Sequence, residues 1–209
     1  RVAIVGHQLL PRIQAIRQEA PDLRHVVAIG GESDPAAGVV SYGYWTAMQS
    51  TECEAAATHR EDPCCLNYSS GTTGEPKGIV HAHQDLPLTA QLWGVDVLGL
   101  REEDRSFAVA KLFFTFGTGG NLIFPWYVGA SVVLYPGPPR DSGQILGHIA
   151  RHRPTIFYNA PTGYGMLLSL PDLTEAHDLS SLRLCVSAGE SLPAPIWQAW
   201  KERTGLDII

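Results

Sequence analysis

The sequence predicts an α/β fold, in which mostly parallel β-sheets are covered by α-helices. Short runs rich in β-branched residues alternate with segments of helical periodicity along the whole chain, and this alternation is typical of parallel sheets with helical connections. Glycine and proline supply 21 and 15 of the 209 residues, a share that indicates many tight turns. Hydrophobic residues make up 44% and charged residues 17%, which excludes an intrinsically disordered chain.

The first part of the chain predicts a single βαβ unit. Its expected elements are, in order, a buried strand at residues 2–5, an amphipathic helix at 9–20 and a second strand at 25–29. The pair Gly30-Gly31 ends the second strand. The following residues, 32–43, are predicted to form a loop, and residues 45–57 carry only a weak pattern.

The dipeptide Asp62-Pro63 marks the expected boundary between two α/β subdomains. Residues 1–62 are then the end of a first subdomain, and residues 63–209 are a second. Strands are predicted in the second at 64–68, 106–110, 131–135, 155–158 and 182–187, and helices at 84–98, 117–128, 142–151, 162–170 and 194–203. We expect residues 64–209 to share one sheet, with a glycine-rich loop at 69–78 leaving the carboxyl end of its first strand.

Charge, hydropathy and cysteine content indicate which partners and which cellular location to expect. The 15 Lys and Arg against 21 Asp and Glu give a net charge of −6 without a charged run, so a nucleic acid is not expected as partner. The mean hydropathy of −0.02 and the lack of an apolar run near the ~18 residues of a membrane span argue against a membrane partner. The four cysteines form no CxxC pair, which indicates a reducing, cytoplasmic location.

Two further features bear on metal binding and on chain length. His148 and His152 are four residues apart on a predicted helix, but no carboxylate or cysteine nearby completes a metal shell, so no metal site is expected. The chain starts at Arg1 without a methionine, directly before a strand-like run, and stops at another apparent strand onset. We therefore expect a fragment of a longer protein, and the sequence leaves the oligomeric state open.

Residues 68–78 form a loop that suits a phosphate chain. The loop reads Tyr-Ser-Ser-Gly-Thr-Thr-Gly-Glu-Pro-Lys-Gly, with four Ser or Thr hydroxyls, three glycines and one lysine. Glycines let backbone N–H groups approach an anion, hydroxyls donate to phosphate oxygens, and the lysine adds a positive charge. The loop is not a Walker A motif, because GxxxxGK[ST] is absent. Composition alone favours a flexible surface loop.

The order of the residues in this loop resembles the signature of the acyl-adenylate-forming superfamily, the AMP-dependent synthetases and ligases. Every constrained position of the pattern aromatic-[ST]-S-G-[ST]-T-G-x-P-K-G is matched. The resemblance implies that the loop holds the β- and γ-phosphates of ATP during adenylation. It assigns ATP binding to Ser69, Ser70, Gly71, Thr72, Thr73, Gly74 and Lys77, and catalysis to Thr72, Thr73 and Lys77.

Two later stretches fit the same superfamily in the same order. Residues 111–117, Lys-Leu-Phe-Phe-Thr-Phe-Gly, are similar to the aromatic motif of benzoate–CoA ligases, although such phenylalanine clusters are more often plain core. Residues 187–193, Ser-Ala-Gly-Glu-Ser-Leu-Pro, resemble the adenine-binding turn; the alternative is an ordinary strand-to-helix turn. The resemblance implies an acyl pocket at Phe114, Thr115, Phe116 and Gly117, and contacts to ATP from Ala188, Gly189, Glu190 and Ser191.

The resemblance implies an ATP-dependent acid–CoA ligase for an aromatic carboxylate such as benzoate, with ATP, Mg²⁺ and CoA as co-substrates. It places the Mg²⁺-binding Glu, a ribose-binding Asp and a Lys of a C-terminal domain beyond Ile209, so these cannot be assigned. Two alternatives stay open. The chain is a truncated, non-catalytic nucleotide-binding piece, or its parent loads the acid onto a carrier-protein thiol instead of CoA.

Overall fold

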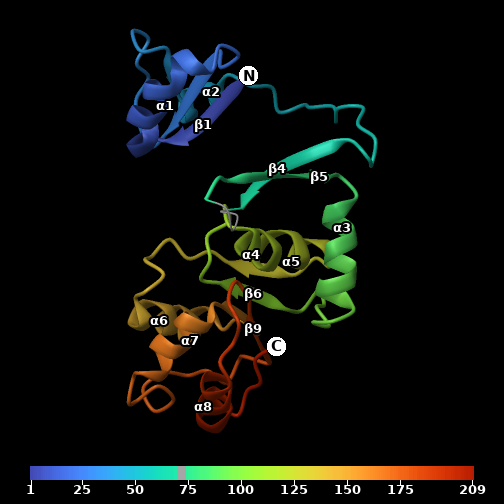
Figure 1. Cartoon of the computed structure of the whole chain (residues 1–209), viewed down its shortest axis with the longest axis vertical. Coiled ribbons are helices and arrows are strands. Elements are labelled where there is room, and N and C mark those ends of the chain that lie inside the picture. Colours follow the sequence, from blue (N-terminus) through green and yellow to red (C-terminus); the bar gives the residue numbers. More distant parts are fainter. Residues whose placement is uncertain (70–73) are drawn as a thin grey trace. The chain divides into compact units, whose positions relative to one another are not determined.

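The structure, a computed structural model, describes residues 1–69 and 74–209 (Figure 1). The chain divides into two compact units, Arg1–Ala57 and Thr58–Ile209, and each is described by itself. Both units contain a parallel sheet with helical connections, which confirms the predicted α/β class. Within the described ranges, no helix combines the length and the apolar character needed to cross a membrane.

The first unit is built on a three-stranded parallel sheet in the order β1-β2-β3. Its elements are β1 (Val2–Gly6), the 3-10 turn η1 (His7–Leu9), α1 (Leu10–Ile16), the 3-10 turn η2 (Arg17–Glu19), β2 (His25–Ile29), β3 (Val39–Ser41) and α2 (Tyr42–Ala47). Val26, Ala28 and Val39 form its small buried core. The expected βαβ unit is present, but β3 lies where a loop was predicted, because a three-residue strand shows no usable periodicity.

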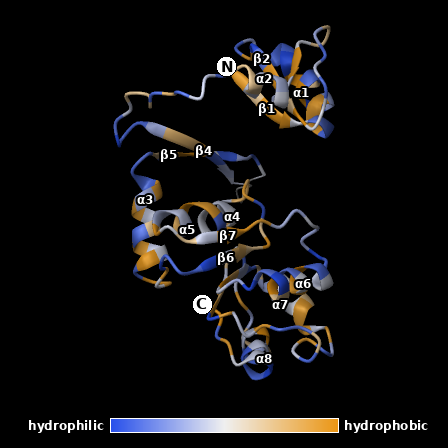
Figure 2. Cartoon of the chain, turned by 180° about the vertical axis from the view of Figure 1, so that it is seen from behind, coloured by the Kyte–Doolittle hydropathy of each residue, from blue (hydrophilic) through white to orange (hydrophobic). Residues whose placement is uncertain are grey.

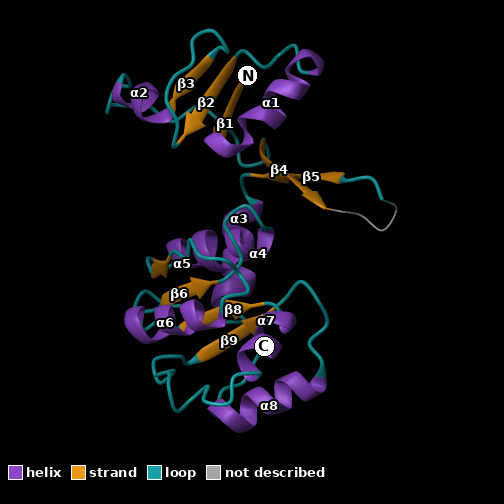
Figure 3. Ribbon diagram, turned by 90° about the vertical axis from the view of Figure 1, so that its left-hand side faces the viewer, coloured by secondary structure: helices purple, strands orange, loops and turns teal. Residues whose placement is uncertain are grey.

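The second unit contains a four-stranded parallel sheet in the order β7-β6-β8-β9 (Figure 3). Its strands are β6 (Arg105–Ala108), β7 (Ser131–Val133), β8 (Ile156–Asn159) and β9 (Leu184–Ser187). The helical segments between and after them are α4 (Thr115–Thr118), the π-helical turn η4 (Gly119–Ile123), α5 (Phe124–Tyr127), α6 (Ser142–His152), α7 (Pro161–Leu168) and α8 (Ala194–Thr204). Ile208 continues the sheet with a parallel bridge to Cys185 of β9.

The two faces of this sheet carry separate apolar cores, because successive strand residues point to opposite faces. Phe107 and Phe157 belong to the core that α6, α7 and α8 cover, where Tyr164 and Trp200 meet edge to face at 4.8 Å between ring centroids. The other core contains Leu98, Leu100, Ala108, Ile156, Tyr158 and Val186, with Phe116, Phe124, Val128 and Leu184 packed against it. The sheet is therefore buried on both sides, as a parallel sheet requires.

Residues 63–82 form a β-hairpin rather than part of this sheet. Strands β4 (Pro63–Ser69) and β5 (Lys77–Ala82) pair antiparallel in a separate two-stranded sheet. The prediction that residues 64–209 share one sheet is therefore wrong. Leu66 and Tyr68 of β4 and Val80 of β5 are at least half exposed, so this strand lacks the two-sided burial of a parallel sheet strand.

The hairpin is followed by α3 (Asp85–Thr89) and the π-helical turn η3 (Ala90–Val95), where one helix was expected at 84–98. Asp85 fixes the start of this segment, because its carboxylate accepts a hydrogen bond from the Ala82 N–H at 2.9 Å. Apolar and polar residues alternate around it, so orange and blue stretches lie side by side in Figure 2. Ala90 and Gly94 are buried and Leu88 and Leu92 exposed, and the buried face packs against α5, where Gly94 faces Phe124.

A buried carboxylate joins three strands at their amino ends. Asp104, only 2% exposed and directly before β6, accepts hydrogen bonds from Arg183 at 2.8 and 2.5 Å and from the Thr155 hydroxyl at 2.7 Å. Thr155 precedes β8 and Arg183 precedes β9. Burial raises the pKa of Asp104, but the bonds from Arg183 and Thr155 outweigh it, so the pKa lies below its ordinary value. The network holds the sheet edge opposite the carboxyl ends.

Candidate active site

The predicted phosphate loop connects the two strands of the hairpin. Ser69 and Lys77 are direct partners at the last pair of the β4–β5 ladder, and the Lys77 side chain is exposed. Gly74 has a φ of +90°, a backbone conformation that favours glycine. The other four assigned residues, Ser70, Gly71, Thr72 and Thr73, lie outside the described residues.

The aromatic motif begins directly after β6 and is anchored by its lysine. The Lys111 ammonium donates hydrogen bonds to the backbone carbonyls of Tyr135 at 2.6 Å and Gly137 at 2.5 Å, and lies 4.6 Å from the centre of the Tyr135 ring. These contacts tie the segment after β7 to the end of β6. Lys111 is thus a positioning residue that sequence reasoning did not single out.

The four predicted pocket residues have different environments. Phe116 is partly buried and meets the Tyr158 ring edge to face at 5.9 Å between centroids. A Cβ on Gly117 would lie 2.2 Å from the Lys111 carbonyl oxygen, so glycine lets α4 pack directly on the backbone of the segment that follows β6. Phe114 is half exposed, and the neighbouring Phe113, which was not assigned to the pocket, is 79% exposed.

Thr115 and Phe116 line one cavity of about 340 Å³ together with Ala188 and Gly189 of the predicted adenine turn. We call it the Tyr158 cavity; it is lined by Thr89, Trp93, Thr115, Phe116, Gly119, Phe124, Tyr158, Val186, Ala188 and Gly189. Gly189 has a φ of +92°, and no described atom lies within 4 Å of its Cβ position. Burial raises the pKa of the Tyr158 hydroxyl well above its ordinary value, so this wall stays uncharged.

A second cavity, of about 550 Å³, lies at the carboxyl ends of β6 and β8. We call it the Asn159 cavity; it is lined by Val109, Ala110, Phe114, Phe116, Pro139, Arg140, Asn159, Ala160, Thr162, Gly163, Met166 and Glu190. It shares Phe116 with the Tyr158 cavity. Two predicted site residues, Gly117 and Ser191, are not among the described residues that line either cavity.

The hairpin contributes to a third cavity, of about 370 Å³, that adjoins the Tyr158 cavity. The two share Thr89, Thr115, Gly119 and Phe124. Cys65 and His81, partners across the β4–β5 ladder, both line it, and the His81 ring nitrogen Nδ1 lies 3.5 Å from an Asp85 carboxylate oxygen. Burial and the neighbouring Cys64 raise the pKa of the Cys65 thiol, so it stays protonated. A packing role fits this cysteine better than reactivity.

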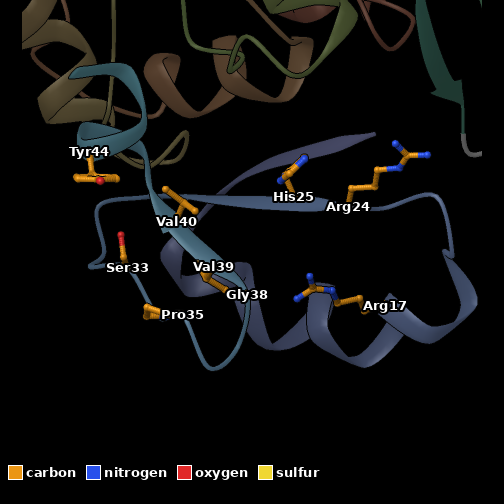
Figure 4. A pocket seen from close by; sticks show the side chains of 9 residues that line it. All are labelled: Arg17, Arg24, His25, Ser33, Pro35, Gly38, Val39, Val40 and Tyr44. Carbon is orange, nitrogen blue, oxygen red and sulfur yellow. The ribbon is translucent and has the colours of Figure 1, made fainter. Parts of the chain in front are cut away.

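A fourth cavity, of about 630 Å³, belongs to the first unit and contains none of the predicted site residues within the described ranges (Figure 4). Arg17, His25 and Tyr44 line it, but the Arg17 guanidinium already donates to the Ala37 carbonyl at 2.7 Å. Across residues 1–69 and 74–209, no group of three His, Cys, Asp or Glu side chains could hold a metal ion.

Open α/β sheets bind ligands at the carboxyl ends of their parallel strands. The aromatic motif and the adenine turn follow such strand ends, whereas the phosphate loop lies on the hairpin. Thr115 and Phe116 follow β6, and Ala188, Gly189 and Glu190 follow β9. Sequence reasoning missed Trp93, Tyr158 and Asn159, which come from segments without a motif.

Comparison with known proteins finds CoA ligases among the relatives of this chain. It is 44% identical over 209 residues to the benzoate–CoA ligase of Thauera aromatica, covering all of this chain and 38% of that protein. The crystal structure of the anthranilate CoA ligase AuaEII in complex with anthranoyl-AMP matches with a TM-score of 0.92 and 64% identity, over 100% of this chain and 40% of that one. A benzoate CoA ligase from Burkholderia xenovorans LB400 matches with a TM-score of 0.82 and 33% identity, over 100% and 40%.

The chain thus spans about two fifths of the length of these relatives. The family model of AMP-binding enzymes matches residues 1–209, that is, the whole chain. On this match, and on the relatives that share its fold and sequence, the chain belongs to the AMP-binding enzyme family.

Proposed function

We propose that this chain is part of an ATP-dependent aromatic acid–CoA ligase, which we call the parent enzyme. Several relatives of the chain are named for benzoate, hydroxybenzoates or anthranilate, and these acids share one aromatic ring with a carboxylate. We infer that the parent enzyme takes such an acid, together with MgATP and CoA.

The Tyr158 cavity carries this proposal. Phe116, Trp93 and Phe124 supply flat apolar walls, and Ala188 and Gly189 connect the cavity to the proposed adenine turn. Its volume of about 340 Å³ lies in the range of small-ligand sites. An aryl ring fits such a slot through area burial and edge or face contacts with the aromatic walls, whereas a methyl group fills little of it.

The proposed reaction has two steps. A carboxylate oxygen of the acid bonds to the α-phosphorus of ATP as the bond to the β-phosphate oxygen breaks, which releases pyrophosphate. The thiol sulfur of CoA then bonds to the acyl carbon as the bond to AMP breaks, and the thiol proton passes to solvent. Such chemistry asks the protein for positioning and charge neutralisation.

We assign these tasks to the three motifs. Ser69, Gly74 and Lys77, with residues 70–73 of the same loop, bind the β- and γ-phosphates, and the Lys77 charge stabilises the leaving pyrophosphate. Residues 188–191 form the turn on which the adenine lies, since the open space at Gly189 admits a flat base. The resemblance places the Mg²⁺-binding Glu beyond Ile209, so we assign no residue of this chain to Mg²⁺ and no step to a metal bound by it.

Product analysis tests this function. The parent enzyme, given ATP, Mg²⁺ and CoA, is expected to form the CoA thioester of benzoate or anthranilate together with AMP, as measured by chromatography and mass spectrometry. With acetate in place of the aromatic acid, formation of the thioester should be far slower. Thioester formation that prefers acetate, or that releases ADP, would contradict the proposal.

Replacing Phe116 with alanine in the parent enzyme should reduce its preference for aromatic over short aliphatic acids. The aryl ring loses one wall, a loss of about 1 kcal/mol beyond buried area, so we expect kcat/KM for benzoate to fall at least about fivefold while that for acetate stays nearly constant. Phe113→Ala is the matched control, because Phe113 is 79% exposed. An unchanged aryl preference in competition assays would show that Phe116 belongs only to the core.

A further inference from the structure

Phe124 lies between two neighbouring cavities of the second unit. These are the Tyr158 cavity, of about 340 Å³, and the third cavity, of about 370 Å³, which we call the hairpin cavity. The described lining residues that they share are Thr89, Thr115, Gly119 and Phe124. Glycine has no side chain and threonine a short one, so the Phe124 ring supplies most of the bulk between the two cavities.

Two glycines hold the Phe124 side chain in this place. Phe124 is the first residue of α5, which packs against η3 and η4 (Figure 1). A Cβ at Gly94 of η3 would lie 3.1 Å from the Phe124 Cβ, and a Cβ at Gly119 of η4 would lie 2.8 Å from Cζ, the far end of the ring. The base of the side chain therefore lies on η3, and the tip of the ring lies against Gly119 in the shared wall.

The hairpin cavity suits an uncharged and largely apolar group. Its remaining described lining residues are Cys65, Asn67, His81, Asp85, Leu86, Thr118, Leu122 and Ile123. An anion would lie near the Asp85 carboxylate and be repelled, and no lysine or arginine is among the described lining residues to hold it. An apolar group instead gains free energy from burial against Leu86, Leu122 and Ile123.

Polar groups of this cavity are already engaged by the protein. The Thr118 hydroxyl donates to the Leu112 carbonyl at 2.5 Å. The Asp85 carboxylate accepts from the Ala82 N–H at 2.9 Å. These groups do not depend on a ligand for their hydrogen bonds, so an apolar occupant leaves them paired.

We propose that Phe124 determines the size of the acid, because its ring closes the passage from the Tyr158 cavity to the hairpin cavity. The inference rests on the proposed ligase function and restricts the wild-type parent enzyme to acids with a single small aromatic ring. Once the Phe124 ring is removed, the two cavities join. The aryl carboxylate stays in the Tyr158 cavity, and the hairpin cavity accepts an uncharged apolar substituent such as the second ring of biphenyl-4-carboxylate.

Phe124→Ala in the parent enzyme tests this role. Acid-dependent exchange of pyrophosphate into ATP is measured with benzoate and with biphenyl-4-carboxylate. We expect the ratio of kcat/KM for biphenyl-4-carboxylate to that for benzoate to rise at least about tenfold, because the second ring gains a buried site while benzoate loses one aromatic wall. An unchanged ratio would overturn the proposal.

A second variant and a control separate this role from a loss of packing. Leucine in Phe124→Leu keeps an apolar contact with Gly94 but lacks the ring tip that reaches Gly119, so the same ratio should rise, though less, even if the alanine variant does not fold. Trp126→Ala is the control, because Trp126 lies on the same helix, is 63% exposed and is not among the described lining residues of either cavity. A rise in the control as large as in Phe124→Leu would contradict the proposal.

The double variant Phe124→Ala/Leu86→Trp tests where the second ring lies. Leu86 lines the hairpin cavity and is not among the described lining residues of the Tyr158 cavity. Tryptophan at this position should fill the hairpin cavity and abolish the gain for biphenyl-4-carboxylate, while kcat/KM for benzoate stays at the value of Phe124→Ala. A gain that persists would place the second ring elsewhere and overturn the proposal. No exchange with benzoate in the wild type would instead refute the ligase function itself.

Discussion

Replacement of Lys77 by alanine in the parent enzyme is expected to slow acid-dependent exchange of pyrophosphate into ATP on the order of 100-fold, the loss typical of one group that stabilises developing charge. Transfer from preformed acyl-adenylate to CoA should change much less. The reason is that the lysine charge acts on the β- and γ-phosphates, which are absent once pyrophosphate has left. Lys77 is exposed at the end of the hairpin ladder, so its removal should not disturb the fold.

Lys201→Ala provides the matched control for this variant. Lys201 lies on α8 and pairs with Asp207 at 2.6 Å on the surface, away from the three motifs in the sequence. Both half-reactions should keep their wild-type rates in this variant. Equal slowing of both half-reactions by Lys77→Ala would contradict the role assigned to the lysine in adenylation.

Asp104→Asn should destabilise the 209-residue chain by about 3 kcal/mol, as measured by urea unfolding followed with tryptophan fluorescence. Breaking a buried ion pair leaves an uncompensated charge, which typically costs about 3–5 kcal/mol. The lower end applies because Arg183 keeps 31% of its side chain exposed. Asp207→Asn, which removes the surface pair with Lys201, is the control and should cost less than about 1 kcal/mol. Similar losses in both variants would contradict the role of the buried network.

The same network predicts a dependence of stability on pH. The pKa of Asp104 in the folded chain lies below its ordinary value of 3.8, so the folded state binds this proton less readily than the unfolded state. The stabilisation by Asp104 is therefore complete above that ordinary value and is lost as the pH falls through the folded-state pKa. The acid side of the stability curve should be flatter in Asp104→Asn than in the wild type.

Periodicity predicted the central sheet well and the hairpin badly, for one physical reason. The strands of the four-stranded sheet are buried on both sides, so each is a short apolar run, as around Phe107 and Phe157, that stands out from its polar flanks. Strand β5 has only two adjacent apolar residues, Ile79 and Val80, between Gly78 and His81. β5 is a strand because it pairs antiparallel with β4. This pairing is a tertiary contact, which the hydrophobic pattern of residues 77–82 does not reveal.

The candidate site likewise contains residues that sequence motifs predicted and residues that only the structure revealed. The motif residues Thr115, Phe116, Ala188 and Gly189 were assigned from sequence, and the structure brings them into one cavity. Trp93 lies in a π-helical turn and Asn159 in a buried strand, where their residue types read as core. Only the spatial arrangement shows that Trp93 lines the Tyr158 cavity and that Asn159 lines the neighbouring one.

Acid-dependent pyrophosphate–ATP exchange by the parent enzyme, measured with benzoate, anthranilate and acetate, tests most directly whether an aromatic acid is activated in the Tyr158 cavity. Burial of an aryl ring in place of a methyl group should raise kcat/KM for the aromatic acids on the order of 100-fold, on about 25 cal/mol for each Å² of apolar area. We therefore predict exchange that requires an acid and strongly prefers the two aromatic ones. Exchange with acetate as fast as with benzoate, or no exchange with any of the three acids, would contradict the account.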